Sequence, residues 1–261
     1  MTARPVPPVA LSRGTYWLDH PMPNRRPPPA AQPRNRFLAR LPDAEYRRLL
    51  PLLKPVELEA GQVLYEARGP IDYAYFPTEA VLSALTVMRD GNAIEVATVG
   101  HEGLVGHYGF GGKTSPHKVI AQVPGQALRI ASRDMHEAAV TDGPLKELLT
   151  AYHVAFMSQV SQSVACNGLH RLEQRCCRWL LMSRDRVGSN DIRLTHEYLA
   201  IMLGARRASV TDALQPLQEA GLVRCERGVI VIIDGAGLEA RSCECYFVVR
   251  DEYTRLLGYS A

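Results

Sequence analysis

The stretch LTHEYLAIMLGARRASVTDALQPLQEAGLV, residues 194–223, has the pattern of two short helices joined by a tight turn. Thr195 can cap the first helix, whose initial turn contains the acidic residue Glu197. Gly204 is placed to end that helix, and Gly221 is placed to stop the second. A short helix, a glycine turn and a second helix are typical of the helix-turn-helix, which reads DNA with the first turns of its second helix.

The start of the second helix is polar on the side that would face DNA. An arginine there can grip O6 and N7 of guanine through two hydrogen bonds, worth ~1–3 kcal/mol of discrimination. We expect phosphate contacts from a two-stranded wing over residues 223–231 and from the helix before the motif. The predicted DNA-binding residues are Thr195, Arg206, Arg207, Ser209 and Thr211, with Arg227 in the wing and Arg171, Arg175 and Arg178 on the preceding helix.

The N-terminal half of the chain has the period of strands. Short apolar segments alternate with glycine turns, and Asp90-Gly91 is a strong hairpin signal. No helical pattern separates these segments, which favours an antiparallel roll rather than a parallel sheet. The predicted strands are Val63–Tyr65, Tyr73–Phe76, Val81–Met88, Ala93–Val99, Lys118–Gln122 and Ala127–Ile130, after a short helix that opens at Leu41-Pro42-Asp43.

After Gly143-Pro144 the apolar spacing becomes helical and stays so to about Asp185. Such a stripe either packs on the roll or pairs with its copy in another subunit, and we assign it to dimerisation. Asn167-Gly168 is predicted to interrupt the helix and to act as a hinge. The residues expected at the dimer interface are Leu145, Leu149, Tyr152, Phe156 and Val160.

Composition fits a globular protein of one or two domains. The 261 residues are 46% hydrophobic and 22% charged, enough to bury a sizeable core. Thirty basic against 27 acidic residues give a net charge of +3, too mild to imply a nucleic-acid partner by itself. No apolar run approaches the roughly 18 residues of a membrane span, and no secretory signal is present. We therefore expect a cytoplasmic protein with no membrane partner.

The predicted fold class is α+β, with an N-terminal antiparallel jelly roll or β-roll, a long dimerisation helix and a C-terminal winged helix-turn-helix. Nine of the 18 prolines lie within residues 1–35, which predicts a disordered tail; a later start at Met22 is an alternative. The expected parts are a Pro/Arg-rich tail (1–36), a β-roll sensor domain (37–142), the dimerisation helix (143–167), the winged helix-turn-helix domain (168–238) and a C-terminal helical extension (239–261).

With a β-rich domain and a long helix before residues 194–223, the chain from about Phe37 to Asp234 resembles the Crp–Fnr family of bacterial transcription regulators. The resemblance implies a cyclic-nucleotide-binding-type jelly roll followed by a winged helix. It also implies a homodimer on a two-fold symmetric site in double-stranded DNA, with half-sites about one DNA turn apart. RNA polymerase is a further candidate partner under this resemblance. The family's central base-reading arginine falls on Arg207.

Two departures from cyclic-AMP-responsive members limit this resemblance. On the recognition helix, their Glu and second Arg are replaced by Ala208 and Asp212, so their half-site is not expected here. In the effector pocket, Gly106-His107 stands at the family's Gly-Glu pair and Ser115-Pro116 at its Arg-Ser pair. A buried cyclic phosphate would lack its two-pronged arginine partner. We therefore predict a degenerate pocket, an unknown effector, and no binding of cyclic AMP.

No cofactor and no metal site are predicted. All six cysteines lie at or after Cys166, so the N-terminal cluster of oxygen-sensing members is absent and no iron–sulfur cluster is expected. Cys243 and Cys245 are assigned to one helix over residues 238–257, where residues two apart point about 200° apart, a poor arrangement for a shared metal or a disulfide. Structural packing is the favoured role, with redox sensing at Cys243/Cys245 or Cys176-Cys177 as the alternative.

Three classes of function remain to be weighed. The leading hypothesis is a dimeric, sequence-specific transcription regulator, either activator or repressor. The alternative is a small-molecule or redox sensor, or a regulatory subunit, whose winged helix binds a protein partner. An enzyme is not expected, because the sequence has no nucleophile elbow, phosphate loop or H-E-x-x-H motif.

Overall fold

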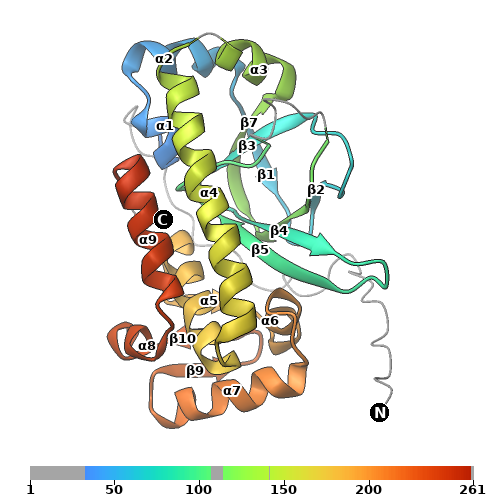
Figure 1. Cartoon of the computed structure of the whole chain (residues 1–261), viewed down its shortest axis with the longest axis vertical. Coiled ribbons are helices and arrows are strands. Elements are labelled where there is room, and N and C mark those ends of the chain that lie inside the picture. The colour runs from blue at the N-terminus through green and yellow to red at the C-terminus, as the bar shows by residue number, and fades with distance from the viewer. Residues whose placement is uncertain (1–32, 107–113, 141, 260–261) are drawn as a thin grey trace.

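The computed structural model describes residues 33–106, 114–140 and 142–259 and consists of a β-roll, a long central helix and a smaller helical domain (Figure 1). The predicted tail, apart from its last few residues, and His107 of the predicted pocket lie outside the described residues. Within the described part of the chain, no helix combines the length and the apolar character needed to cross a membrane.

The roll confirms the predicted fold class, because its two sheets are antiparallel throughout. One sheet has the order β1-β7-β3 and the other β2-β6-β4-β5. All six predicted strands are present, and β1 is an addition. The elements are α1 (Arg36–Arg40), α2 (Asp43–Leu49), η1 (Leu50–Leu52), β1 (Lys54–Leu58), β2 (Val63–Tyr65), β3 (Tyr73–Pro77), β4 (Val81–Val87), β5 (Ala93–Val99), β6 (Lys118–Val123), β7 (Gly125–Ala131) and α3 (Ser132–Val140).

Helix α4 (Pro144–Leu169) runs the length of the molecule, with proline in its first turn (Figure 1). The predicted interruption at Asn167-Gly168 is wrong, since α4 continues through both residues. A glycine in a helix costs only about 1 kcal/mol, which the packing around α4 offsets. The chain leaves the helix at His170 and Arg171, both of which have extended backbone.

The apolar stripe assigned to dimerisation is buried inside the single chain. Leu145, Leu149, Tyr152 and Phe156 are at most 2% exposed. The Tyr152 hydroxyl donates to the Leu104 carbonyl at 2.9 Å and accepts from the Leu104 N–H at 3.1 Å, which ties α4 to the roll. These side chains cannot contact a second copy directly, so the predicted dimer interface is corrected. Val160, the fifth member of the stripe, is half-buried against the same core.

The second domain begins with α5 (Leu172–Val187) and contains the predicted helix-turn-helix and wing. Its helices cover a three-stranded antiparallel sheet of order β8-β10-β9. The predicted C-terminal helix over residues 238–257 is in fact two helices, and the second of them returns along α4 (Figure 1). The remaining elements are β8 (Asp191–Arg193), α6 (His196–Met202), α7 (Arg207–Glu219), β9 (Val223–Glu226), β10 (Val229–Ile232), α8 (Gly235–Arg241) and α9 (Cys245–Leu257).

Candidate nucleic-acid interface

Helices α6 and α7 form the expected helix-turn-helix. The Thr195 side chain caps α6 by accepting from the Tyr198 N–H at 3.1 Å, so this predicted DNA-binding residue has a structural role here. Gly204 lies in the turn with φ +58°, in the left-handed region that favours glycine. A Cβ at Gly204 would lie 2.7 Å from Cδ1 of Ile94. The turn is therefore packed closely against β5 of the roll.

The start of α7 presents its polar residues to solvent. Val210, Leu214 and Leu217 are completely buried and hold the inner face of α7 in the core of the domain. Arg206 and Arg207 are exposed at the first turn, together with Ser209 and Thr211. The structure thus brings together the four residues predicted to read bases, on the surface that a major groove could reach.

The hydroxyl of Thr211 is committed to contacts within the motif. It donates its proton to the Arg207 carbonyl at 3.1 Å and lies 3.0 Å from Nδ1 of His196. Because the hydroxyl has one proton, we assign the proton of the second contact to His196 Nδ1. Burial, with the nearby Arg207 charge, holds the pKa of His196 below its usual value, so the imidazole is neutral at pH 7. Thr211 therefore presents its methyl group and not a free donor.

The predicted wing is present, with its tip at Arg227-Gly228 between β9 and β10. Arg227 is exposed at this tip and is free to approach a phosphate. The neighbouring Arg224 instead donates to Glu226 at 2.7 Å.

Only one of the three arginines expected on the preceding helix is available to DNA. Arg171 is exposed at the N-cap of α5. Arg175 is half-buried and donates to the Leu203 carbonyl, which fixes the end of α6. Arg178 is 8% exposed and donates to the Ser163 hydroxyl at 3.2 Å. The prediction that Arg175 and Arg178 reach phosphates is therefore wrong.

A cleft of about 1080 Å³ separates the reading turn from the β4–β5 hairpin of the roll. Arg206, Arg207 and Ser209 line one side, and Val87 and Asn92 of the hairpin line the other. Figure 1 shows the β4–β5 hairpin lying above α6 in this view. In this conformation the roll therefore lies directly beside the residues expected to contact bases.

The predicted effector pocket is described only in part. Ser115 is 1% exposed, and its hydroxyl donates to the His117 carbonyl at 2.6 Å, whereas Pro116 is exposed. Gly106 has φ +88°, and a Cβ there would lie 2.6 Å from the Tyr65 hydroxyl. Both segments are thus closely packed, and neither places an arginine where the family's phosphate-binding arginine would stand.

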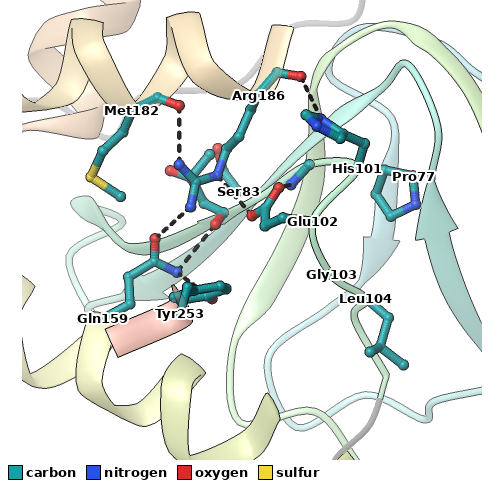
Figure 2. A network of polar contacts seen from close by, with 12 residues as sticks. Pro77, Ser83, His101, Glu102, Gly103, Leu104, Gln159, Met182, Arg186 and Tyr253 are labelled. Atoms are coloured by element: carbon teal, nitrogen blue, oxygen red, sulfur yellow. Dashed lines mark hydrogen bonds and ion pairs between the residues drawn. The ribbon is translucent and has the colours of Figure 1, made fainter. Parts of the chain in front are cut away.

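A buried ion pair connects the roll to the reading domain (Figure 2). Arg186 of α5 donates from Nε to Glu102 at 2.9 Å, and the two side chains are 1% and 0% exposed. Arg186 also donates to the Gln159 amide oxygen on α4 at 3.2 Å and to the Met182 carbonyl at 3.0 Å. A Cβ at Gly100 would lie 2.8 Å from Cβ of Arg186, so only glycine permits this approach.

A second buried contact crosses the same boundary. The Trp179 indole of α5 donates to Glu95 of β5 at 2.9 Å. Burial raises the pKa of Glu95, although hydrogen bonds from Ser83, Thr98 and Trp179 and the charge of Arg178 oppose the shift. The Ser83 hydroxyl lies 2.5 Å from both Glu95 Oε2 and Gln122 Oε1. One hydroxyl proton cannot serve two acceptors, so either a proton on Glu95 or the Gln122 amide turned with its nitrogen towards Ser83 completes this network.

The cysteine geometry differs from the prediction. Cys243 precedes α9 and Cys245 begins it, so the two do not lie on one helix pointing apart. Their sulfur atoms gather with Cys166 Sγ and a ring nitrogen of His170, and these four potential ligand atoms all lie within 4.8 Å of one another. The argument that Cys243 and Cys245 are unsuited to a shared ligand is therefore wrong. By contrast, burial raises the pKa of Cys176 and of Cys177 to about 12, as expected for structural thiols.

Comparison with known proteins divides the chain as the structure does. Residues 55–142 match the family described as cyclic nucleotide-binding domain, and residues 174–241 match the one described as Crp-like helix-turn-helix domain. The chain is 26% identical over 195 residues to the transcriptional regulator SdrP of Thermus thermophilus, covering 70% of this chain and 92% of that protein.

Solved structures show the same fold. FixK2 from Bradyrhizobium japonicum superposes with a TM-score of 0.64 at 16% identity, covering 73% of this chain and 98% of the other. A regulator from Eubacterium rectale, described as a putative member of the crp/fnr family, gives a TM-score of 0.62 at 19% identity, covering 77% and 94%. The roll, the long helix and the helix-turn-helix thus occur together in these proteins.

Proposed function

Because the chain belongs to the Crp–Fnr family of transcription regulators, whose helix-turn-helix binds DNA, we propose that it binds a two-fold symmetric site as a homodimer and reads bases with the start of α7. The observation that carries this proposal is the exposed first turn of α7. Its arginines and its serine face outward while its apolar side is locked in the core. A helix fixed on one face and polar at its exposed N-terminal end is what major-groove reading requires.

Arg207 is the residue proposed to specify sequence. It stands at the first position of α7. Among the described residues, its guanidinium donates to no other protein group, so it can donate to a base. Two hydrogen bonds to guanine would contribute ~1–3 kcal/mol of discrimination per half-site. Arg206 and Ser209 flank it and would contact neighbouring bases or phosphates. Arg171 and Arg227 lie on separate elements, where they would hold the backbone and set the orientation of α7.

The exposed face of α4 is the proposed dimer interface. Val154, Met157 and Val164 are 47%, 44% and 67% exposed, although they are apolar. Their spacing of three and seven residues places them along one face of α4, opposite the stripe buried against the roll. A second copy of the chain is the partner proposed here, because a symmetric DNA site needs two reading domains related by the same two-fold axis.

The roll is proposed to act as the control domain. Glu102 and Glu95 give it two buried contacts to α5, which immediately precedes the reading helices. The chain is non-helical at His170 and Arg171, between α4 and α5, which provides a place for the reading domain to rotate. An effector that bound the roll more tightly in one orientation would shift the population of that orientation. We do not propose cyclic AMP, because no arginine takes the phosphate-binding position at Ser115-Pro116.

Selection from random duplex DNA with purified full-length protein tests this function. At about 150 mM salt, nonspecific phosphate binding is weakened and specific sites are favoured. We expect enrichment of a palindromic consensus with half-site centres about 10 base pairs apart. If the protein alone enriches nothing, the selection is repeated with cell extract, which supplies an effector. No enrichment in either case would refute sequence-specific DNA binding, and a consensus without symmetry would refute the dimer.

A further inference from the structure

The end of α4 and the segment between α8 and α9 bring four soft metal ligands together. They are Cys166 and His170 from α4 and its C-cap, and Cys243 and Cys245 from the start of the C-terminal segment. The three cysteines are at most 1% exposed and form a buried cluster separate from the main hydrophobic core. We propose that these residues bind one Zn²⁺ ion as a Cys₃His site.

The distances fit one tetrahedral ion. Zn–S bonds of about 2.3 Å and Zn–N bonds of about 2.0–2.1 Å place neighbouring ligand atoms roughly 3.5–3.8 Å apart. Cys166 Sγ lies 3.5 Å from Cys243 Sγ, and Cys245 Sγ lies 3.4 Å from His170 Nδ1. All four atoms lie within 4.8 Å of one another, so shifts of about 1 Å would complete the tetrahedron. The same closeness leaves no room for the additional iron and sulfide atoms of a cluster.

Outer contacts already orient the ligands as a metal site would need. The Nε2 atom of His170 lies 3.2 Å from the Glu244 carboxylate, while Nδ1 faces the sulfur atoms. A carboxylate behind the histidine fixes the ring and its tautomer, as in many zinc sites. The Gln162 amide donates to Cys245 Sγ at 3.1 Å, which stabilises a thiolate. A purely structural cysteine cluster would need neither contact.

Charge also favours three thiolates around a divalent ion. Three thiolates, a neutral histidine and Zn²⁺ carry a net charge of −1. Arg178 is buried, and among the described residues its Nε and Nη1 atoms have no hydrogen-bond partner. A buried arginine without full partners is costly, and an anionic site beside it offsets that cost.

The site lies where the end of α4 meets the start of the C-terminal segment. Cys166 lies in the last turn of α4 and His170 lies in the break before α5, whereas Cys243 and Cys245 begin the segment that returns along α4. One ion would therefore cross-link the end of α4 to the start of α9.

Metal content of the full-length protein is the first test. The protein is purified under reducing conditions without chelator, and its zinc is measured by inductively coupled plasma mass spectrometry. We expect one zinc per chain, lost in Cys245→Ser and in His170→Gln. Cys225→Ser is the matched control, since Cys225 lies in the wing outside the cluster, and it retains the metal. Circular dichroism of each variant shows whether a loss of metal reflects unfolding.

Cobalt reports the ligand geometry. Replacing zinc with Co²⁺ is expected to give the visible bands of a tetrahedral thiolate site, weakened in Cys245→Ser. Glu244→Gln should weaken metal affinity about 10-fold, the low end for an outer-shell residue, because Glu244 is largely exposed. Glu252→Gln, about two turns further along α9 in an ion pair with Arg255, is the control and leaves affinity unchanged.

Three results would overturn the proposal. The first is a folded protein that takes up neither zinc nor cobalt at one ion per chain. The second is iron with sulfide in place of zinc. The third is a Cys166–Cys243 disulfide in protein purified without reductant, combined with no metal uptake after reduction.

Discussion

The buried ion pair between Glu102 and Arg186 should contribute strongly to stability, and Arg186→Met tests this. The substitution keeps much of the side-chain volume but removes the hydrogen bonds to Glu102, Gln159 and Met182. Glu102 then keeps the hydrogen bond from the Gly100 N–H at 2.9 Å but has no cationic partner. Its carboxylate is 0% exposed, so water cannot replace that partner. Removing one partner of a buried pair typically costs about 3–5 kcal/mol.

Urea denaturation at pH 7, followed by circular dichroism, measures that cost. For a chain of this size the loss corresponds to a fall in Tm of about 6–20 °C. The double variant Glu102→Gln/Arg186→Met removes the isolated charge, so we expect a coupling energy of about 1–3 kcal/mol between the two positions. Arg255→Met, which breaks an exposed pair with Glu252, is the control and should leave the midpoint unchanged. A loss below about 1 kcal/mol in Arg186→Met, or strict additivity in the double variant, would refute the reasoning.

Three further predictions concern the dimer, pH and the reading turn. Met157→Glu places a charge on the exposed face of α4 and should produce monomers in sedimentation velocity, whereas Met88→Glu, at an exposed methionine between β4 and β5 of the roll, should not; a dimeric Met157→Glu would contradict the proposed interface. Burial raises the folded-state pKa of Glu95, so the folded state binds the proton more tightly and stability should fall as pH rises from about 4.5 through the raised value. Glu95→Gln should remove that slope in urea titrations at several pH values, and an unchanged slope would show that Glu95 is not its source. Gly204→Ala must adopt φ +58° against Ile94 and should cost about 1–2 kcal/mol in the same assay, with weaker DNA binding; full stability would contradict the close packing of the turn.

Local patterns were sufficient to predict most of the fold. The predicted strands and the helix-turn-helix follow from alternating apolar residues, from Thr195 as a cap and from glycines with positive φ, all of which act within a few residues. Strand β1 was missed because only its last residue, Leu58, is fully buried, so it has no clear alternation. The break at Ser242 was missed because a helical apolar spacing continues across it.

The remaining errors concern contacts between distant segments. The stripe of α4 that includes Tyr152 could face either the roll or a second chain, and only the folded chain shows that the roll covers it. The arrangement of Cys166 against Cys243 depends on the return of α9 along α4, which no local pattern contains. Glu95 did carry a signal, since an acidic residue at an inward position of an apolar strand needs a partner. That signal does not identify Trp179 as the partner.

The most direct test of the central claim compares two duplexes in fluorescence anisotropy. One contains the selected consensus, the other contains a scrambled sequence, and each is measured with wild type, Arg207→Ala and Arg171→Ala at about 150 mM salt. Arg207→Ala should reduce the ratio of the two Kd values by about 5–150-fold per half-site, since it removes the base-reading contact. Arg171→Ala should weaken both duplexes alike and keep the ratio, since it removes a phosphate contact. An unchanged ratio in Arg207→Ala would contradict the claim that the start of α7 reads DNA sequence.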